Sequence, residues 1–365
     1  MKVLFLHNAV PEYRIEFWRL LSSFCNLDLL ITSKGLDKKI YNLEKDSSGL
    51  SINYLNWSNI NHWLNEATNY DVVILPPVDD VYLYIISKMF LHAGLRASKK
   101  VVLWTEGWIW HKIPIIKKLY KECMRLLMRD IGKQCDVCIA SGKQSYHSLQ
   151  KLGIDRNKLA IAVDSSTSPK YRNDSRISIF DEIKNRRVIL FLGRIVKRKG
   201  CNLLIKAFDN LYKDNKDVCL LIGGEGPELE GCKKLASGLA SIDHIHFIGK
   251  VQPSQRAYYY KKADVFVLPS YAYHGTVEAW GLTVNESMEQ GTPVVATNVV
   301  GAAYDLLNTP LCGIMVKENS IRDLQIAISK ILAIPRNITR DACLKEYSKY
   351  SVNNMAKSFY DIISR

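Results

Sequence analysis

The feature of this chain that most limits its fold is a regular alternation of short apolar runs with longer amphipathic stretches. The apolar runs read as buried strands, and helical patterns separate them. The runs cover residues 2–6, 27–31, 71–75, 101–104, 137–140 and 159–163, and then residues 188–192, 218–222, 245–248, 265–268 and 294–296. Strands that alternate with helices form parallel sheets, so the pattern predicts two similar α/β domains with a cleft between them.

A polar stretch separates the two series of runs. Residues 164–169 are rich in Ser, Thr and Pro, and the polar composition continues to Arg187. Such a composition is typical of a linker. With 365 residues in the chain, each domain is long enough to bury its own core.

Composition favours a globular protein of the cytoplasm. Hydrophobic residues make up 47% and charged residues 24% of the chain, which is normal for that class. No apolar run approaches the roughly 20 residues that span a bilayer. The first nine residues have an apolar centre too short for a signal peptide, so we expect them to form the first strand.

The nine cysteines argue for reduced thiols rather than a disulfide framework, because their number is odd and they are scattered through apolar segments. Cys135 and Cys138 are the only close pair. They lack a second pair at the spacing of a zinc site, which favours core packing over metal binding.

The net charge of +14 is concentrated in one region, since residues 84–158 contain 15 Lys and Arg against 5 Asp and Glu. Such a patch implies an anionic partner, which could be nucleic acid, a membrane surface or a phosphorylated substrate. The segment lacks a recognisable nucleic-acid recognition motif.

Residues 114–129 of this region read as a basic amphipathic helix. One stripe of the helix is apolar and contains Ile116, Tyr120, Cys123 and Leu127. Basic side chains occupy other positions of the helix, namely Lys117, Lys118, Lys121, Arg125 and Arg129. Such a helix either covers the sheet or docks on an anionic membrane, and the sequence leaves both interpretations open.

The segment 278–286 carries the clearest chemical signal. It follows one predicted strand and brings Gly281, Leu282 and Thr283 to the start of a short helix, where free N–H groups attract an anion such as diphosphate. Glu278 and Glu286 flank that point and are good acceptors for hydroxyl hydrogens. A nucleotide sugar combines both groups. The alternative is a simple capping box made by Thr283 and Glu286.

Two further loops leave the ends of predicted strands in the same half. Gly193 and Arg194 begin a loop that ends at Lys199, and its two cations suit a departing diphosphate. The alternative is a solvated basic turn. The other loop contains Glu225 among glycines that permit close approach of a ligand. Parallel pairing would bring all three loops to one edge of the sheet.

Six segments, in order, resemble the carboxyl-terminal half of retaining GT-B glycosyltransferases of family 4. They begin at Gly193, Gly224, His246, Ala263, Glu278 and Gly291. The resemblance covers residues 188 to about 316. It implies a GT-B fold, with an acceptor-side Rossmann-like domain over residues 1–168, a nucleotide-sugar domain over 169–350, and a helix over 351–365 that crosses back to the first domain.

The resemblance also implies roles for individual residues. Arg194 and Lys199 would hold the donor diphosphate, Glu286 the ribose hydroxyls and Glu278 the transferred sugar. The remaining donor-binding residues would be Gly193, Glu225, Gly226, Lys250, Val251, Gly281, Leu282 and Thr283. Lys250 and Val251 would lie beside the base.

The amino-terminal half carries the predicted acceptor side. Residues 7–14 replace the glycine pair of many family members, in a version that resembles a bacterial surface-polysaccharide subgroup. Residues 105–111 follow a predicted strand, and their aromatic rings suit sugar faces. The acceptor-side candidates are Tyr13, Arg14, Glu106, Trp108 and His111. Buried aromatic packing is the alternative for each Trp.

Together these patterns predict a retaining glycosyltransferase that moves a sugar from a UDP- or GDP-sugar to a glycan or lipid-linked acceptor, in bacterial polysaccharide or lipopolysaccharide synthesis at the inner membrane face. No cofactor is expected. The chain has no Asp-x-Asp pair to hold a divalent metal. The alternatives are a nucleotide-sugar epimerase of the same fold and a non-catalytic binder of anionic membrane or nucleic acid.

Overall fold

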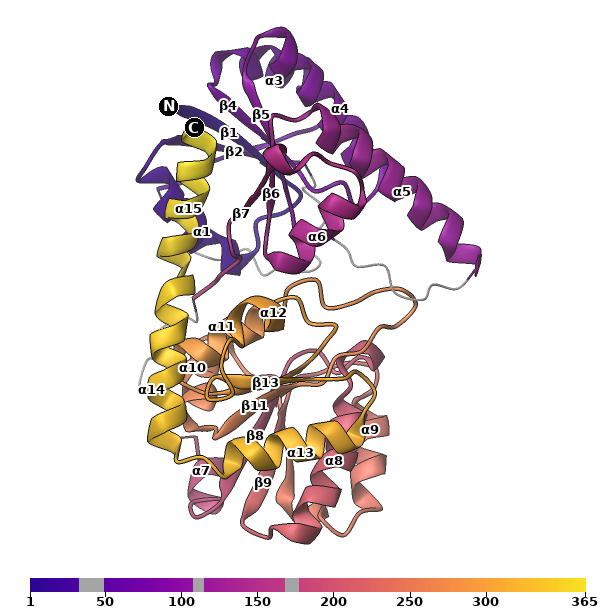
Figure 1. Ribbon diagram of the computed structural model, residues 1–365, viewed down its shortest axis with the longest axis vertical. Helices are drawn as coiled ribbons and strands as arrows, with labels where there is room; N and C mark the ends of the chain where they lie inside the picture. Colours follow the sequence, from indigo (N-terminus) through magenta and orange to yellow (C-terminus); the bar gives the residue numbers. More distant parts are fainter. Residues whose placement is uncertain (33–48, 108–114, 168–176) are drawn as a thin grey trace. The chain divides into compact units, whose positions relative to one another are not determined.

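The computed structural model describes residues 1–32, 49–107, 115–167 and 177–365. The chain divides into two compact units (Figure 1). Unit 1 holds the amino-terminal part as far as Ser166, together with Ser351–Arg365. Unit 2 holds Thr167–Tyr350. The predicted boundary between residues 168 and 169 lies outside the described residues.

Unit 1 is built on one parallel sheet, whose strand order is β3-β2-β1-β4-β5-β6-β7. Its strands are β1 (Lys2–His7), β2 (Asn26–Ile31), β3 (Ser51–Tyr54), β4 (Val72–Leu75), β5 (Lys100–Thr105), β6 (Val137–Ala140) and β7 (Leu159–Ile161). Each neighbouring pair is parallel. Near-continuous apolar runs suit such strands because helices cover both faces.

Helices bury the two faces of this sheet. Val3 and Phe5 of β1 face the core under α1 (Glu12–Ser22) and α15 (Val352–Ser364), whereas Leu4 and Leu6 face the opposite core. The opposite core is covered by α3 (Ile60–Glu66), α4 (Val81–Arg96), α5 (Ile115–Gln134) and α6 (Lys143–Lys151). Successive side chains of β1 therefore serve two separate cores.

Unit 2 repeats the architecture with strand order β10-β9-β8-β11-β12-β13. Its strands are β8 (Arg187–Leu192), β9 (Val218–Gly223), β10 (Ile245–Gly249), β11 (Val265–Leu268), β12 (Val294–Thr297) and β13 (Gly313–Val316), all parallel to their neighbours. Its helices are α7 (Ile179–Glu182), α8 (Cys201–Asp214), α9 (Leu229–Ser237), α10 (Pro253–Lys262), α11 (Leu282–Glu289), α12 (Ala303–Leu306), α13 (Ile321–Leu332) and α14 (Arg336–Tyr347).

Each sheet has one point where the winding direction reverses. In unit 1 the point lies between β1 and β4, and in unit 2 it lies between β8 and β11. Ligands bind outside the carboxyl ends of the strands at such a point in sheets of this type. The topology therefore marks one candidate ligand position in each unit.

The predicted α/β fold with two parallel sheets is confirmed. All eleven predicted strands are present, within one or two residues of the expected bounds. The prediction missed β3 and β13, which are both edge strands. Within the described ranges, no helix combines the length and apolar character that crossing a membrane requires.

The last helix belongs to the core of the first unit, as predicted. α15 lies along α1 on the sheet of unit 1 (Figure 1). Phe359 is fully buried, with its ring centroid 5.8 Å from that of Phe5, 5.4 Å from Phe17 and 5.6 Å from Trp104. A segment about 350 positions from β1 in the sequence therefore completes the core on which β1 rests.

We predict that Phe359→Ala destabilises unit 1 by about 3 to 5 kcal/mol, because it leaves a cavity among aromatic rings. Urea unfolding followed by tryptophan fluorescence measures the change. Lys357→Ala is the matched control, since Lys357 is an exposed residue of the same helix. Equal unfolding midpoints for the two variants would contradict this packing role.

Candidate functional site

Unit 2 contains a cavity of about 590 Å³ at the point where its winding reverses. Loops that follow β8, β9 and β10 form its walls together with side chains of α10 and α11. The lining residues are Leu192, Gly193, Arg194, Gly223, Gly224, Glu225, Gly226, Lys250, Val251, Arg256, Tyr260, Thr283 and Glu286. Parallel pairing has brought the three loops to one edge of the sheet.

Backbone contacts join the first two of these loops. The Gly193 N–H donates to the Gly223 carbonyl at 3.0 Å, and the Ile195 N–H donates to the Glu225 carbonyl at 2.8 Å. Gly224 has a φ of +137°, and a Cβ there would collide with the Gly193 carbonyl oxygen. Packing between the two loops therefore requires glycine at this position, whether or not a ligand also approaches it.

The Glu286 carboxylate is held at the cavity wall by α10. The Tyr260 hydroxyl donates to Oε2 at 3.0 Å, and Arg256 Nη1 lies 3.5 Å from Oε1. The Glu286 side chain is only 8% exposed. Burial and the charge of Glu286 raise the pKa of Tyr260 well above its usual value, so its hydroxyl stays a donor. Two partners thus fix a carboxylate that can accept further hydrogen bonds.

The start of α11 does not use a capping box. Its N-cap residue is Gly281, with a φ of +100°, and no side chain caps the helix. The Thr283 hydroxyl is buried and has no hydrogen-bond partner among the described residues. The capping-box interpretation of Thr283 and Glu286 is therefore wrong. A buried hydroxyl of this kind needs a partner, which a ligand in the cavity can provide.

Two cations, Arg198 and Lys199, share one buried carboxylate beside this cavity, and a third, Arg194, lies near enough to Lys199 to act on its pKa. Glu278 Oε2 accepts from Arg198 Nη1 at 2.5 Å and lies 2.7 Å from Lys199 Nζ. Burial opposes ionisation of Glu278, but Lys199 and Arg198 lower its pKa. Burial also lowers the pKa of Lys199, and the charges of Arg198 and Arg194 add to this shift while Glu278 opposes it. One carboxylate does not balance the cations, and an anion would stabilise the cluster.

The structure brings most of the predicted donor residues together. The cavity is lined by Gly193, Arg194, Glu225, Gly226, Lys250, Val251, Thr283 and Glu286. The other predicted residues are absent from its lining, and they are Lys199, Glu278, Gly281 and Leu282. Lys199 and Glu278 are instead paired with each other, which the separate roles predicted for them did not anticipate.

Sequence reasoning missed three residues at this site. Arg256 and Tyr260 are four positions apart after the strand β10, a spacing that places both on one helix face, and this signal was available. Arg198 stands in the segment 194–199, where four of the six residues are basic. Its contact with a carboxylate 80 positions away leaves no trace in local sequence.

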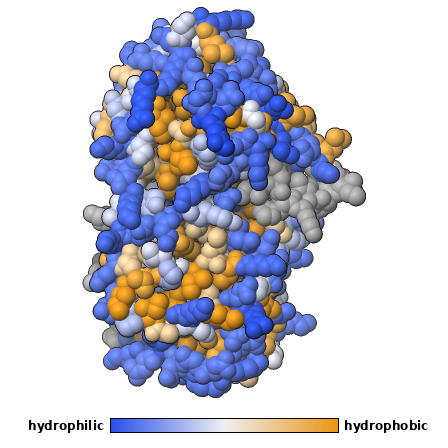
Figure 2. All heavy atoms as spheres, in the orientation of Figure 1, coloured by the Kyte–Doolittle hydropathy of each residue, from blue (hydrophilic) through white to orange (hydrophobic). Residues whose placement is uncertain are grey.

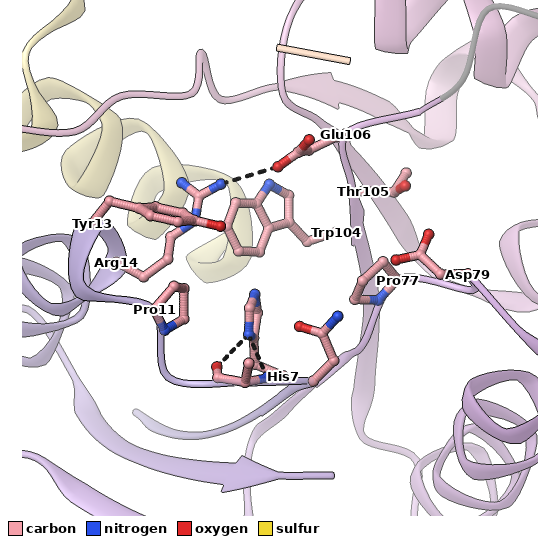
Figure 3. A pocket seen from close by; sticks show the side chains of 11 residues that line it. His7, Pro11, Tyr13, Arg14, Pro77, Asp79, Trp104, Thr105 and Glu106 are labelled. Carbon is pink, nitrogen blue, oxygen red and sulfur yellow. Dashed lines mark hydrogen bonds and ion pairs between the residues drawn. The ribbon is translucent and has the colours of Figure 1, made fainter. Parts of the chain in front are cut away.

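Unit 1 contains a smaller cavity of about 150 Å³ at its own reversal point (Figure 3). It lies at the carboxyl ends of β1, β4 and β5. The lining residues are His7, Asn8, Ala9, Pro11, Tyr13, Arg14, Pro77, Asp79, Trp104, Thr105 and Glu106. Three of the predicted acceptor-side residues, Tyr13, Arg14 and Glu106, are among them, whereas Trp108 and His111 lie outside the described residues.

Arg14 is buried beside this cavity and its charge is balanced within the protein. Arg14 Nη2 donates to Asp164 Oδ2 at 2.7 Å, and Nη1 contacts the other carboxylate oxygen. Burial opposes the charged form, but Asp164 raises the pKa of Arg14. The guanidinium also lies 4.7 Å from the Trp104 ring centroid and 3.4 Å from Glu106 (Figure 3).

Asp164 corrects the predicted linker. Asp164, Ser165 and Ser166 are fully buried in unit 1, and the Ser165 N–H contacts the sulfur of Met355 on α15 at 3.3 Å. The start of the stretch 164–169 is therefore part of the core. In the sequence these polar residues read as a linker because Arg14, which pairs with Asp164, lies 150 positions away.

His7 is the second buried polar group of this cavity. Its Nδ1 lies 2.7 Å from the Ala9 carbonyl oxygen and 3.3 Å from the Ala9 nitrogen, and the shorter contact favours a hydrogen on Nδ1. Burial, with a contribution from the Arg14 charge, lowers the pKa of His7 to about 4. The ring is therefore neutral at pH 7 and its Nε2 is an acceptor. Figure 3 shows this edge of the ring directed toward Trp104 and away from the strand.

α5 presents an apolar stripe to solvent as well as one to the core. Its buried apolar residues are Met124, Met128 and Ile131, and not the predicted stripe that includes Cys123. On the opposite side, Leu119 is 81% and Leu126 is 61% exposed. Orange atoms lie at the surface where Figure 1 places α5 (Figure 2).

The basic residues predicted on α5 differ in exposure. Lys118 and Arg129 are exposed, whereas Lys121 and Arg125 are half-buried and Arg125 is paired with Glu122 at 2.9 Å. The side chain of Lys117 lies outside the described part of the chain. Two of the predicted cations, Lys118 and Arg129, are therefore exposed on the same helix as the exposed apolar stripe.

The cysteines are free thiols wherever the structure describes them. Cys135 and Cys138 are both buried in the core of unit 1, in agreement with packing. In the described ranges, no group of three or more His, Cys, Asp or Glu side chains could hold a metal ion.

Residues 174–349 match the family model described as Glycosyl transferases group 1. This part of the chain is a glycosyl transferases group 1 domain. The match spans the strands, loops and helices that form the cavity of unit 2. It confirms the family resemblance predicted from the motifs.

Two curated relatives carry more specific names. The chain is 37% identical over 122 residues to the alpha-monoglucosyldiacylglycerol synthase of Streptococcus pneumoniae, covering 33% of this chain and 26% of that protein. It is 30% identical over 256 residues to the GDP-mannose-dependent alpha-(1-6)-phosphatidylinositol monomannoside mannosyltransferase of Mycobacterium tuberculosis, covering 66% and 62%. The chain thus spans less than two thirds of either relative.

Solved structures show the same fold over the whole chain. HepE of Anabaena in complex with UDP superimposes with a TM-score of 0.77 at 16% identity, covering 100% of both chains. The apo form of the lipopolysaccharide outer core galactosyltransferase WaaB gives a TM-score of 0.71 at 14% identity, covering 100% of this chain and 99% of that one. The predicted GT-B fold is confirmed alongside the group 1 domain.

The depressed pKa of His7 predicts how stability depends on pH. The unfolded ring titrates near 6.5 and the folded ring near 4, so the unfolded chain binds the proton more readily. The stabilisation from the neutral ring is present above pH 6.5 and is lost as the pH falls through 4. When the pH falls from 7.5 to 4.5, we expect the free energy of unfolding of His7→Gln to decrease by about 2.5 kcal/mol less than that of the parent protein.

Urea unfolding at the two pH values measures this difference. His147→Gln is the control, because His147 is exposed and should follow the parent. An identical loss of stability in the parent and in His7→Gln would refute the buried neutral state of His7.

Proposed function

We propose that the chain is a retaining glycosyltransferase that takes a sugar from a nucleoside-diphosphate sugar and transfers it to a glycan or lipid-linked acceptor. The observation that carries the proposal is the pairing, in unit 2, of an excess of cations with a separately fixed carboxylate. Arg194 and Lys199 suit a diphosphate, and Glu286 suits hydroxyl groups. A nucleotide sugar carries both features in one molecule.

The roles follow from this chemistry. Arg194 and Lys199 stabilise the negative charge that develops on the departing diphosphate, while Glu286 accepts hydrogen bonds from the ribose. Glu278 accepts a hydroxyl of the transferred sugar. The Thr283 hydroxyl and the backbone at Gly281 and Leu282 complete the phosphate contacts. The other wall residues, Gly193, Glu225, Gly226, Lys250 and Val251, enclose the nucleoside.

Transfer with retention needs no nucleophile from the protein. The acceptor hydroxyl attacks the anomeric carbon on the face that the diphosphate leaves, so that one C–O bond forms as the other breaks and the hydroxyl proton passes to a phosphate oxygen. The names of both curated relatives include the word alpha. Because the sugar in common donors of this kind is itself alpha-linked, an alpha product supports retention of the anomeric configuration.

The leaving group is stabilised by fixed side-chain cations, so we propose that the reaction needs no divalent metal. Arg194 and Lys199 provide the charge that a metal provides in other enzymes. UDP or GDP donors both fit this scheme, and the names of similar proteins include UDP and GDP-mannose.

The acceptor binds in the cavity of unit 1 and is uncharged where it contacts that cavity. Arg14 is balanced by Asp164, while Glu106 and Asp79 add acceptors to the wall. His7 contributes a neutral ring nitrogen. These groups favour hydroxyls over phosphates or carboxylates, as expected for a sugar acceptor in polysaccharide or lipopolysaccharide synthesis.

α5 attaches the enzyme to an anionic membrane, at the cytoplasmic face of the inner membrane. The exposed Leu119 and Leu126 enter the interface, and Lys118 and Arg129 contact lipid head groups. This position brings the enzyme to a lipid-linked acceptor.

A donor panel tests the proposed activity. The enzyme should bind and hydrolyse one or more UDP- or GDP-sugars in excess EDTA, and Glu286→Ala should weaken binding by about 10-fold or more because a charge-assisted hydrogen bond is lost. Isothermal titration gives the affinity, with Glu230→Ala, an exposed glutamate of unit 2, as control. Binding that is restored in EDTA only by Mg²⁺ or Mn²⁺ would overturn the proposed metal independence.

The membrane proposal has a separate test. Lys118→Glu with Arg129→Glu should reduce co-sedimentation with phosphatidylserine vesicles by at least about 30-fold, since each cation contributes roughly 1 kcal/mol. Lys151→Glu with Arg156→Glu reverses the same charge at exposed positions elsewhere in unit 1 and should sediment like the parent. Equal sedimentation of both double variants would remove α5 from the membrane contact.

A further inference from the structure

Arg198 is not among the residues that line the cavity in unit 2, yet it is paired with the same carboxylate as Lys199. Both cations reach Oε2 of Glu278, Arg198 at 2.5 Å and Lys199 at 2.7 Å. The side chains of Lys199 and Glu278 are 11% and 13% exposed. The Arg198 carbonyl accepts from the Tyr271 N–H at 2.9 Å, which anchors its backbone to the loop after β11.

This shared carboxylate creates a competition. A diphosphate that binds Lys199 draws the ammonium toward itself and weakens its contact with Glu278, although the three N–H donors of the ammonium can reach both anions. If Lys199 were its only partner, Glu278 would then be a buried carboxylate with a weakened counter-ion, and such a group is costly. Arg198 removes this cost, since it stays on Oε2 while Lys199 turns to the phosphate.

We propose that Arg198 is a positioning residue that keeps Glu278 in place when the donor diphosphate takes over Lys199, and that Glu278 competes with the diphosphate for Lys199. The inference rests on the proposed function of unit 2. It assigns Arg198 a role through Glu278 alone, without contact to the phosphate. The free nucleoside diphosphate is therefore the right probe, since it contains the diphosphate but no sugar for Glu278 to hold.

A double-mutant cycle on full-length protein tests this role, with UDP and GDP titrated calorimetrically. Arg198→Ala should raise the Kd on the order of 10-fold, because one charged contact is missing in the bound state. Glu278→Gln should lower the Kd, because the competitor for Lys199 is gone. In the Glu278→Gln background, Arg198→Ala should have no more effect than Lys197→Ala, which removes the same charge from an exposed neighbour. Arg198→Lys should recover most of the affinity.

Two results would overturn the inference. One is an Arg198→Ala effect that matches that of Lys197→Ala in the parent, which would reduce Arg198 to general surface charge. The other is an Arg198→Ala effect of equal size with and without Glu278→Gln, which would mean that Arg198 acts on the nucleotide directly. Failure of the parent to bind either nucleotide is distinguishable from both, since it would refute the proposed function itself.

Discussion

The unequal balance of charge around Glu278 is the constraint on which the site of unit 2 depends. Arg198 and Lys199 contact one buried carboxylate and Arg194 lies near Lys199, so Glu278 is held ionised while Lys199 is under-compensated. A buried cluster with surplus positive charge is stable only beside water or an anion. The fold meets this condition by placing the cluster next to a cavity at the carboxyl edge of a parallel sheet.

The strands that sequence predicted and those that it missed differ in a physical way. Central strands such as β8 and β11 are buried on both faces and read as continuous apolar runs. β3 and β13 are two of the four edge strands, and their burial is partial. Edge strands need fewer apolar residues, and no apolar run of four marks β3 or β13, whereas apolar residues dominate the other two edge strands, β7 and β10, which were predicted.

The site residues that the sequence predicted and those that it missed also differ in a physical way. Residues on loops directly after strands, such as Arg194 and Glu225, were predictable because parallel pairing fixes where those loops meet. Partners distant in sequence were not. Asp164 reads as a turn residue until Arg14 is placed beside it, and Arg198 reads as solvated charge until Glu278 is placed beside it. Such pairs are products of the tertiary fold.

The place of α15 in unit 1 has a consequence for synthesis on the ribosome. The helix supplies Met355, Phe359 and Ile363 to the core under β1, yet it emerges only after the whole of unit 2. Unit 2 is continuous in sequence from Thr167 to Tyr350 and contains its own core. Domains are usually completed in the order in which they are made. In this chain the second unit can be finished first, and the nascent first unit exposes an apolar groove until α15 arrives.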